Sequence, residues 1–233
     1  MMRALIFDFD GIIVDTEPIH YRAFQEVLEP LGLGYSWEEY VSGYMGYDDR
    51  EAFREAFKAR SKSIRNDELG RLITQKASVF LKIIEGGIKA YPGVVKLIHD
   101  TAGNMPLALC SGALVSDITP ILDQLGIRDK FDVVVTADDV AASKPDPASY
   151  ILAVHRLSAA YPDSSIKPQN CLAIEDTPAG IESAKGAGIA VLAVTNSYPA
   201  ERLKGADHIV DSMEKLTLRD LCNLRGEGGQ KCA

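Results

Sequence analysis

The sequence predicts an α/β fold in which a parallel sheet carries helices on both faces and a second, helical domain interrupts the chain early. Short continuous apolar runs alternate with stretches of helical periodicity, which is typical of parallel strands buried on both faces. The connection from Gly11 to Leu107 contains no convincing strand and is far too long for a simple crossover. Of the 233 residues, 46% are hydrophobic and 25% charged, so an ordinary globular core can form.

Five apolar runs are expected to be strands, and three intervening segments are expected to be helices. Pro147 suits the first turn of a helix, and Gly126 and Gly188 suit helix ends. Alternation of strand and helix implies a parallel sheet with helices on both faces. The expected strands are Ala4–Phe9, Leu107–Cys110, Phe131–Thr136, Cys171–Ile174 and Ala190–Val194, and the expected helices are Leu114–Leu125, Pro147–Ala160 and Ala179–Gly188.

The long connection is expected to form a helical domain of its own. Its apolar residues recur at helical spacing, as in the series Phe53, Ala56 and Phe57. Gly86-Gly87 ends the last of these segments. We therefore expect a sheet domain formed by residues 1–16 and 87–225, a helical domain formed by residues 17–86, and a flexible tail at residues 226–233.

Charge and composition limit the partners. Lys and Arg total 25 and Asp and Glu total 33, so the net charge is −8. An acidic chain is a poor general binder of nucleic acid or of anionic membranes. No apolar run reaches the ~18 residues that a spanning helix needs, and the N-terminus does not fit a signal peptide. We expect a cytoplasmic monomer with reduced cysteines, none of them a strong nucleophile, at positions Cys110, Cys171, Cys222 and Cys232.

An acidic pair lies at the end of the first expected strand. Asp8 and Asp10 are two residues apart, so in an extended chain both side chains point the same way. Gly11 then permits a sharp exit from the strand. Buried carboxylates at a strand end are costly unless a cation or a function compensates, although an ordinary Asp-Gly turn is the plainer alternative.

Polar groups also follow three other expected strands. Ser111 and the amides after it, including that of Gly112, can cradle an anion, although for Ser111 taken alone an ordinary N-cap serine is the better explanation. Lys144 stands on a stiff Pro-flanked loop and can neutralise a phosphate and a nucleophile together, unless it is simply a solvated loop lysine. Glu175 and Asp176 form a second acidic pair, which otherwise serves as an acidic helix N-terminus.

These four groups are expected to meet, because sites in open parallel sheets form at the carboxyl ends of the strands. The order acid pair, hydroxyl, lysine, acid pair describes a carboxylate nucleophile, a phosphate cradle and a magnesium site. Asp176 is a convincing ligand for a hard cation if it faces Asp8.

The pattern resembles the haloacid dehalogenase (HAD) superfamily, and most closely its phosphatase and β-phosphoglucomutase-like branch. The resemblance covers almost the whole chain and rests on the segments FDFDGIIVDTEPIH, CSG, ASKPDP and AIEDTPAGIESAKGAG. It implies a Rossmann-like, HAD-like sheet core with a small inserted α-helical cap domain.

The resemblance also implies a role for each matching residue. Asp8 looks like the nucleophile that accepts the phosphoryl group, and Asp10 looks like the general acid and base. Ser111 matches the hydroxyl that holds a phosphate oxygen, and Lys144 matches the charge-balancing lysine. Mg²⁺ would be held by Asp8, Asp10 through its carbonyl, and Asp176, with Glu175 as an outer or additional ligand. True dehalogenases of this superfamily lack an aspartate at the position of Asp10, which argues against dehalogenation.

Residues of the expected cap are predicted to choose the substrate. Thr16 lies at the first hinge, and His20 and Lys76 match positions that often carry polar groups in this branch. Arg50 can grip a second anionic group or simply lie on an exposed helix. Mutases carry arginine three residues after the cap glycine, whereas here Arg50 is the fourth residue after Gly46, so the match to a mutase is out of register by one.

The sequence therefore predicts an Mg²⁺-dependent phosphatase of small phosphorylated metabolites such as sugar phosphates, acting through an aspartyl-phosphate. The alternative within the family is a β-phosphoglucomutase-like sugar-phosphate mutase. A non-enzymatic phospho-acceptor domain is less favoured, because such domains lack a large helical insertion. A dinucleotide-binding domain is disfavoured, because no G-x-G-x-x-G follows the first strand.

Overall fold

The chain folds into two compact units in the computed structural model, which describes residues 1–45, 47 and 49–224. One unit combines Met1–Asp15 with the chain from Lys89 onward, and the other spans Thr16–Ile88. These limits lie close to those expected from the sequence. The expected tail at residues 226–233 lies outside the described residues.

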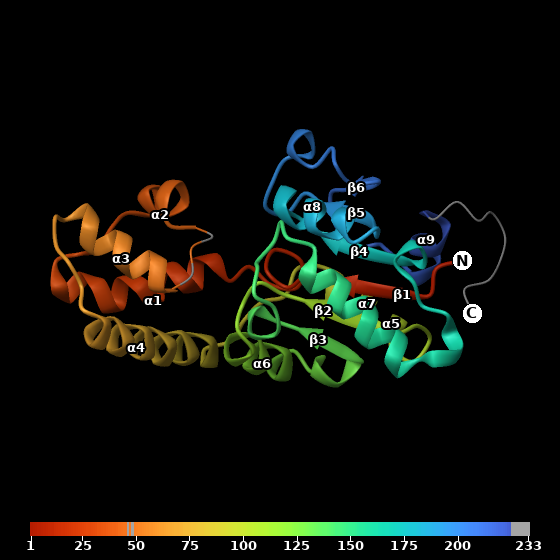
Figure 1. Ribbon diagram of the computed structural model, residues 1–233, viewed down its shortest axis with the longest axis horizontal. Coiled ribbons are helices and arrows are strands. Elements are labelled where there is room, and N and C mark those ends of the chain that lie inside the picture. Colours follow the sequence, from red (N-terminus) through yellow and green to blue (C-terminus); the bar gives the residue numbers. More distant parts are fainter. Residues whose placement is uncertain (46, 48, 225–233) are drawn as a thin grey trace. The chain divides into compact units, whose positions relative to one another are not determined.

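The first unit contains a six-stranded parallel sheet in the order β3-β2-β1-β4-β5-β6, labelled in Figure 1. The parallel α/β architecture predicted from the sequence is confirmed. Two expected strands are shorter than predicted, and β6 was not expected, because it is three residues long and lies at the sheet edge. The strands are β1 (Ala4–Phe7), β2 (Leu107–Cys110), β3 (Val133–Val135), β4 (Cys171–Glu175), β5 (Ala190–Val194) and β6 (His208–Val210).

Helices cover the sheet because its strands carry apolar side chains on both faces. Tyr150 and Ala153 pack in one cluster with Ile6 and Ala173 of the sheet, while the neighbouring strand residue Leu5 is also fully buried. The helices of this unit are α5 (Val94–Thr101), α6 (Val115–Gln124), α7 (Ala148–Ala160), α8 (Pro178–Gly186) and α9 (Leu218–Leu224), with 3-10 turns at Arg128–Lys130, Ala137–Asp139, Pro162–Ser164, Pro168–Asn170 and Ala200–Arg202.

The strand order reverses its direction at β1. Ile6 of β1 is in register with Ala108 of β2 on one side and with Ala173 of β4 on the other. In open parallel sheets, the crevice beyond the carboxyl ends of the strands at such a reversal is the usual place for a ligand. Asp8 follows β1 directly, and Asp176 follows β4 directly, so both acids lie at this point.

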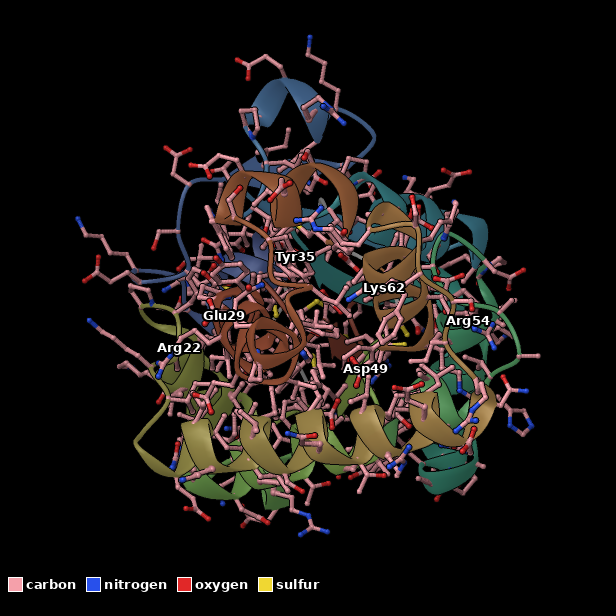
Figure 2. The ribbon with its side chains drawn as sticks, turned by 90° about the vertical axis from the view of Figure 1, so that its left-hand side faces the viewer. Arg22, Glu29, Tyr35, Asp49, Arg54 and Lys62 are labelled. Atoms are coloured by element: carbon pink, nitrogen blue, oxygen red, sulfur yellow. The ribbon has the colours of Figure 1, made fainter. Side chains whose placement is uncertain are left out.

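The second unit is helical, with its own apolar core. The core includes Phe24, Leu28 and Phe53, and the exterior carries charged side chains such as those of Arg22 and Arg54 (Figure 2). The helix α2 was not expected, although Ser36 and Glu39 form a capping box at its start, which is a recognisable signal. The elements are α1 (Glu17–Leu28), a 3-10 turn at Glu29–Leu31, α2 (Trp37–Gly43), α3 (Asp49–Ala59) and α4 (Asn66–Glu85).

Two cysteines behave as predicted and one does not. Cys110 and Cys171 are free and buried, and burial raises the pKa of the Cys110 thiol to about 12, so it is a poor nucleophile. Cys222 is disulfide-bonded, so the expectation of four reduced thiols is wrong for it. Cys232 lies outside the described residues. In the described part of the chain, no helix combines the length and apolar character that crossing a membrane requires.

Candidate active site

Lys144 joins the ends of three strands. Its ammonium nitrogen Nζ lies 2.6 Å from Asp8 Oδ1, 2.6 Å from Glu175 Oε1 and 3.1 Å from the Cys110 carbonyl oxygen. These three partners belong to the carboxyl ends of β1, β2 and β4. Burial alone would lower the pKa of Lys144, but the carboxylates of Asp8 and Glu175 raise it above its ordinary value, so the side chain stays charged.

Asp8 is a buried carboxylate held at the end of β1. Its backbone amide donates to the carbonyl of Ile174 at 3.0 Å, which fixes the chain as it leaves the strand. Burial raises the pKa of Asp8 well above its ordinary value, the nearby charge of Glu175 adds to the rise, and Lys144 opposes it. The carboxylate is therefore under electrostatic strain that a further cation would relieve.

Glu175 is fully buried and anchors Lys144. Its Oε1 also accepts a hydrogen bond from the Tyr150 hydroxyl of α7 at 2.7 Å. Lys144 Nζ in turn lies 5.1 Å from the centre of the Tyr150 ring. A Cβ atom on Gly180 would overlap the Glu175 carboxylate, so glycine is required there. Tyr150 was not predicted, because it lies inside a helix and not at a strand end.

Asp176 is a fully buried carboxylate whose two oxygens differ. The Ser197 hydroxyl donates to Oδ2, whereas Oδ1 has no hydrogen-bond partner among the described residues. Gly11 packs against this carboxylate with φ of 81°, and a Cβ atom there would overlap it. The amide Nδ2 of Asn196 donates to the Gly11 carbonyl at 2.6 Å. Neither Asn196 nor Ser197 was predicted as a site residue, although both follow the expected fifth strand.

The acids at this edge fit a divalent cation. Asp8, Glu175 and Asp176 each offer a carboxylate oxygen, and these oxygens all lie within 4.8 Å of one another. Three carboxylates face one ammonium, that of Lys144, so two negative charges are uncompensated when all four side chains are ionised. Burial, assisted by Glu175 and opposed by Ser197, raises the pKa of Asp176 to about 7. A buried oxygen without a partner and an excess of two negative charges are the features that a hard cation would satisfy.

Three further predicted residues lie near this edge with less definite contacts. Asp10 is half-buried, forms a bridge with Val14, and its charge acts on Asp176, but its carboxylate is not part of the three-acid group. Ser111 is buried, and its hydroxyl accepts from the Ala113 amide at 3.0 Å, as in a helix-entry turn. Gly112 is exposed, and a Cβ atom there would meet nothing within 4 Å, so space does not require glycine.

The helical unit contains a second polar cluster, which holds two of the four predicted substrate residues of that unit. Lys76 Nζ lies 2.7 Å from Asp49 Oδ1 and 2.8 Å from His20 Nδ1. Burial, together with the charge of Lys76, lowers the pKa of His20 to about 3, so the imidazole is neutral and accepts the hydrogen bond. Thr16 is buried and Arg50 is exposed.

Asp49 was not predicted as a site residue, although it precedes Arg50 directly. The side chain of Asp49 is labelled in Figure 2. Residues 46 and 48, which form part of the expected G-x-x-x-R pattern, lie outside the described residues.

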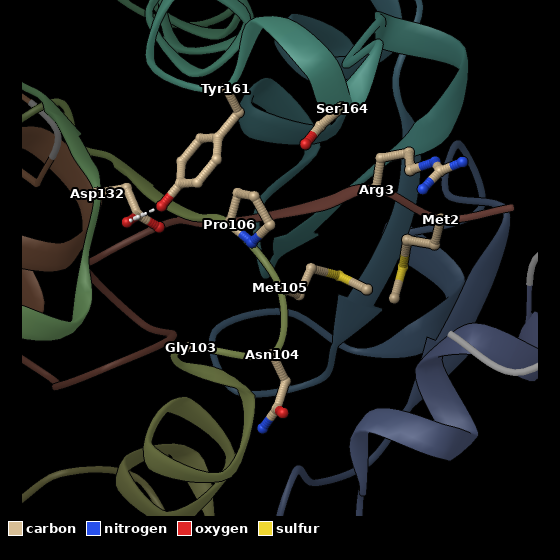
Figure 3. A pocket seen from close by; sticks show the side chains of 9 residues that line it. All are labelled: Met2, Arg3, Gly103, Asn104, Met105, Pro106, Asp132, Tyr161 and Ser164. Atoms are coloured by element: carbon tan, nitrogen blue, oxygen red, sulfur yellow. Dashed lines mark hydrogen bonds between the residues drawn. The ribbon is translucent and has the colours of Figure 1, made fainter. Parts of the chain in front are cut away.

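The opposite edge of the sheet carries a hollow of a different kind, shown in Figure 3. It is lined by residues that precede β1, β2 and β3 and by Tyr161 and Ser164, which follow α7, and the predicted site residues do not line it. The Tyr161 hydroxyl donates to Asp132 Oδ1 at 2.5 Å, and the other Asp132 oxygen accepts from the Leu107 amide at 2.8 Å. This carboxylate therefore holds the start of β2 in place, and its oxygens are satisfied.

Known proteins that match most of this chain are similar to it in sequence and in fold. The family model "Haloacid dehalogenase-like hydrolase" matches residues 5–194. The chain is 33% identical over 226 residues to YhcW of Bacillus subtilis (strain 168), and the aligned region covers 94% of this chain and 95% of the relative. It is 32% identical over 192 residues to the phosphorylated carbohydrates phosphatase of Thermotoga maritima, which covers 81% of this chain and 82% of the relative.

A solved structure agrees with both units of the chain. The crystal structure of β-phosphoglucomutase from Clostridium difficile matches with a TM-score of 0.79 and 28% sequence identity, and it covers 97% of each chain. The relatives of matching length thus include both a named phosphatase and a named mutase.

Proposed function

Because the chain belongs to the haloacid dehalogenase-like hydrolases, in the branch that holds phosphatases and β-phosphoglucomutases, we propose that it is a magnesium-dependent phosphatase of small phosphorylated metabolites. The observation that carries this proposal is the group formed by Lys144 with Asp8, Glu175 and Asp176. In this group, the ammonium of Lys144 is the one fixed positive charge among three buried acids. A divalent cation would complete the arrangement, and a phosphate group could then bind there.

Asp8 is the nucleophile of the proposed reaction. One of its carboxylate oxygens forms a bond to phosphorus while the bond from phosphorus to the leaving oxygen of the substrate breaks. Asp10 gives its proton to that leaving oxygen and later takes a proton from the water that attacks the aspartyl-phosphate, which releases inorganic phosphate and restores Asp8. The half-buried position of Asp10, next to the turn at Gly11, leaves it accessible for both transfers.

Lys144 and the acids determine the electrostatics of this step. A carboxylate and a phosphate dianion repel each other, and Lys144, which already contacts Asp8, reduces the repulsion. Mg²⁺, which Asp8, Asp176, Glu175 and the Asp10 carbonyl would hold, supplies further positive charge for the phosphate oxygens when it is bound. Ser111 and the amides that follow it, including that of Gly112, are proposed to receive a phosphate oxygen at the entrance to α6.

Sugar phosphates are the proposed substrate class. The relative from Thermotoga maritima is named for phosphorylated carbohydrates, which supports this choice. Within the helical unit, Thr16, His20, Lys76 and Arg50 are proposed to contribute to substrate choice, as the family resemblance implies. His20 and Lys76 already form one hydrogen-bonded cluster, which supports treating them together.

A sugar-phosphate mutase is the second candidate, favoured by the similarity to β-phosphoglucomutase over nearly the whole chain. Two features favour hydrolysis instead. Arg50 is displaced by one position from the mutase pattern, and the one buried lysine described in the helical unit is already paired with Asp49. A mutase needs a second group of side chains that binds phosphate, whereas a phosphatase needs only to let water reach the aspartyl-phosphate.

Release of inorganic phosphate from a panel of substrates tests the proposal. The panel holds sugar monophosphates, sugar bisphosphates, phosphoglycolate and nucleotides, each with Mg²⁺ and with EDTA. The proposal predicts magnesium-dependent release from at least one sugar monophosphate without a bisphosphate primer. Isomerisation that requires a bisphosphate primer would instead identify a mutase, and a stable acyl-phosphate without turnover would identify a phospho-acceptor domain.

The remaining expectations concern partners and location. We propose a monomer that acts on a small molecule, with neither nucleic acid nor membrane as a partner, and the net charge of −8 supports the exclusion of polyanions. The cytoplasmic location stays a prediction from the sequence. Size-exclusion chromatography with light scattering measures the oligomeric state.

A further inference from the structure

The loop that follows β5 contacts both acidic segments of the site through two neighbouring side chains. Asn196 donates to the carbonyl of Gly11, in the turn that carries Asp10, and Ser197 donates to Asp176 at the end of β4. The loop therefore ties together two segments that are far apart in the sequence.

The contact from Ser197 makes the two oxygens of Asp176 unequal. Oδ2 is occupied by the Ser197 hydroxyl, while the buried Oδ1 has no partner among the described residues. Ser197 itself is exposed. When its hydroxyl turns towards the buried carboxylate, it gives up only a hydrogen bond to water. A hydrogen bond to one oxygen fixes the rotation of the carboxylate about its last torsion angle, which leaves the other oxygen in a defined place.

The contact from Asn196 acts on the backbone beside Asp10. Gly11 has a φ of 81°, and a Cβ atom there would overlap both the Asp176 carboxylate and the Ser197 hydroxyl. The turn, the acid and the loop are thus packed against one another without spare room. A hydrogen bond to the Gly11 carbonyl holds the turn in the one position that this packing allows.

We propose that Asn196 and Ser197 are positioning residues of the metal site, which place the Asp176 carboxylate and the turn after Asp10 so that a divalent cation binds tightly. The inference rests on the proposed function to the extent that this site holds such a cation. It concerns the affinity for metal and not the identity of the phosphorylated substrate.

Direct metal binding by the full chain tests the inference without any substrate. Mn²⁺ is titrated into the metal-free protein, and the dissociation constant is measured by calorimetry or by the relaxation of water protons. Loss of a group that orients a ligand typically weakens metal binding by about 10–100-fold, so Ser197→Ala is expected to raise the dissociation constant by at least ~10-fold. Ser197→Thr, which keeps the hydroxyl, is expected to restore most of the affinity.

Thr195→Ala is the matched control, because Thr195 lies in the same loop and its hydroxyl contacts Asp211 instead of the acids of the site. This variant is expected to bind Mn²⁺ as the wild type does. Asn196→Ala is expected to weaken binding less than Ser197→Ala, since it acts through the backbone. The double variant is expected to lose less affinity than the two single losses combined, because both side chains position one site.

The outcomes separate this inference from the proposed function. If the wild type binds Mn²⁺ and Ser197→Ala binds it equally well, the positioning role is wrong while the metal-dependent function stands. If Ser197→Ala and Thr195→Ala lose affinity and thermal stability together, the loop has a general structural role and the inference is also wrong. If the wild type does not bind Mn²⁺ at millimolar concentrations, the metal site itself is wrong, and the inference falls with it.

Discussion

Each of the two units holds a lysine with little exposed surface, Lys144 in the sheet unit and Lys76 in the helical unit, and the charges of these two lysines are balanced differently. In the sheet unit, Lys144 pairs with Asp8 and Glu175, and a third acid, Asp176, lies within the same group. In the helical unit, Lys76 pairs with Asp49 and contacts the neutral His20. The first cluster therefore carries excess negative charge, whereas the second is electrically neutral.

The surroundings of the acids explain how each cluster tolerates its charges. The Glu175 side chain is 0% exposed, so it depends on protein groups for all of its stabilisation, whereas the Asp49 side chain is 27% exposed and can also be hydrated. Lys76 is enclosed by the rings of Phe24 and Phe80, at 5.0 and 5.4 Å from their centres. A cluster with unbalanced buried charge is the one that a ligand can stabilise most, which distinguishes a chemical site from a structural or recognition site.

Removal of the proposed nucleophile is expected to have the largest effect. Asp8→Asn keeps the shape of the side chain and an oxygen that can accept from Lys144, but it removes the attacking carboxylate. Turnover is expected to fall by at least about 10³-fold, as for other covalent nucleophiles. Thermal stability is expected to stay the same or to rise, because one of three mutually repelling acids is neutralised. Phosphate release and a melting curve measure the two effects, and measurable activity above background would remove Asp8 from this role.

Replacement of each lysine by methionine tests the comparison itself. Lys144→Met leaves the buried Glu175 and Asp8 without their cation, and breaking a buried pair in this way costs about 3–5 kcal/mol. Lys76→Met leaves Asp49 partly exposed to water, and the methionine fits between aromatic rings, but the His20 nitrogen loses its donor, so the expected loss is smaller, about 1–3 kcal/mol. Urea unfolding of both variants at pH 7 provides the measurement. Equal losses would show that the two clusters do not differ as described.

The neutral histidine of the second cluster predicts a pH dependence. The pKa of His20 falls from 6.5 to about 3 on folding, so the unfolded chain binds a proton that the folded chain refuses. The contribution of His20 to stability is therefore complete above pH 6.5 and is lost as the pH falls towards 3. Between pH 8 and pH 5, wild type should lose about 2 kcal/mol more than His20→Gln, which keeps a hydrogen-bond acceptor for Lys76. Identical pH profiles for the two proteins would contradict a neutral, buried His20.

The strand pattern predicted most of the sheet and the edge at which its polar groups gather, because buried parallel strands leave a local trace in the sequence. Asp8, Glu175 and Asp176 were predicted for the same reason, since they lie at or directly after strand ends, whereas Lys144 was predicted from its Pro-flanked loop beyond β3. Their catalytic and metal-binding roles stay predictions. Tyr150 and Ser197 were missed, because their contacts join segments 25 and 21 residues apart and depend on tertiary packing that no local pattern records.

Tyr150→Phe makes the smallest change to the charged cluster, because it removes one hydrogen bond and keeps the ring beside Lys144. Without the hydroxyl, Glu175 has fewer donors and attracts Lys144 more strongly, at the expense of the contact between Lys144 and Asp8. A hydrogen bond to a charged group of this kind is worth about 1.5–3 kcal/mol. We expect ~1.4 kcal/mol to be lost in the transition state of Tyr150→Phe, which corresponds to a tenfold fall in kcat. KM is expected to change little, since the hydroxyl contacts Glu175 and not the substrate.

Tyr161→Phe is the matched control, because it deletes a tyrosine–carboxylate hydrogen bond of similar length at the opposite edge of the sheet. Its kcat should equal that of the wild type, and equal losses of kcat in both variants would mean that Tyr150 acts on the stability of the unit and not on Lys144.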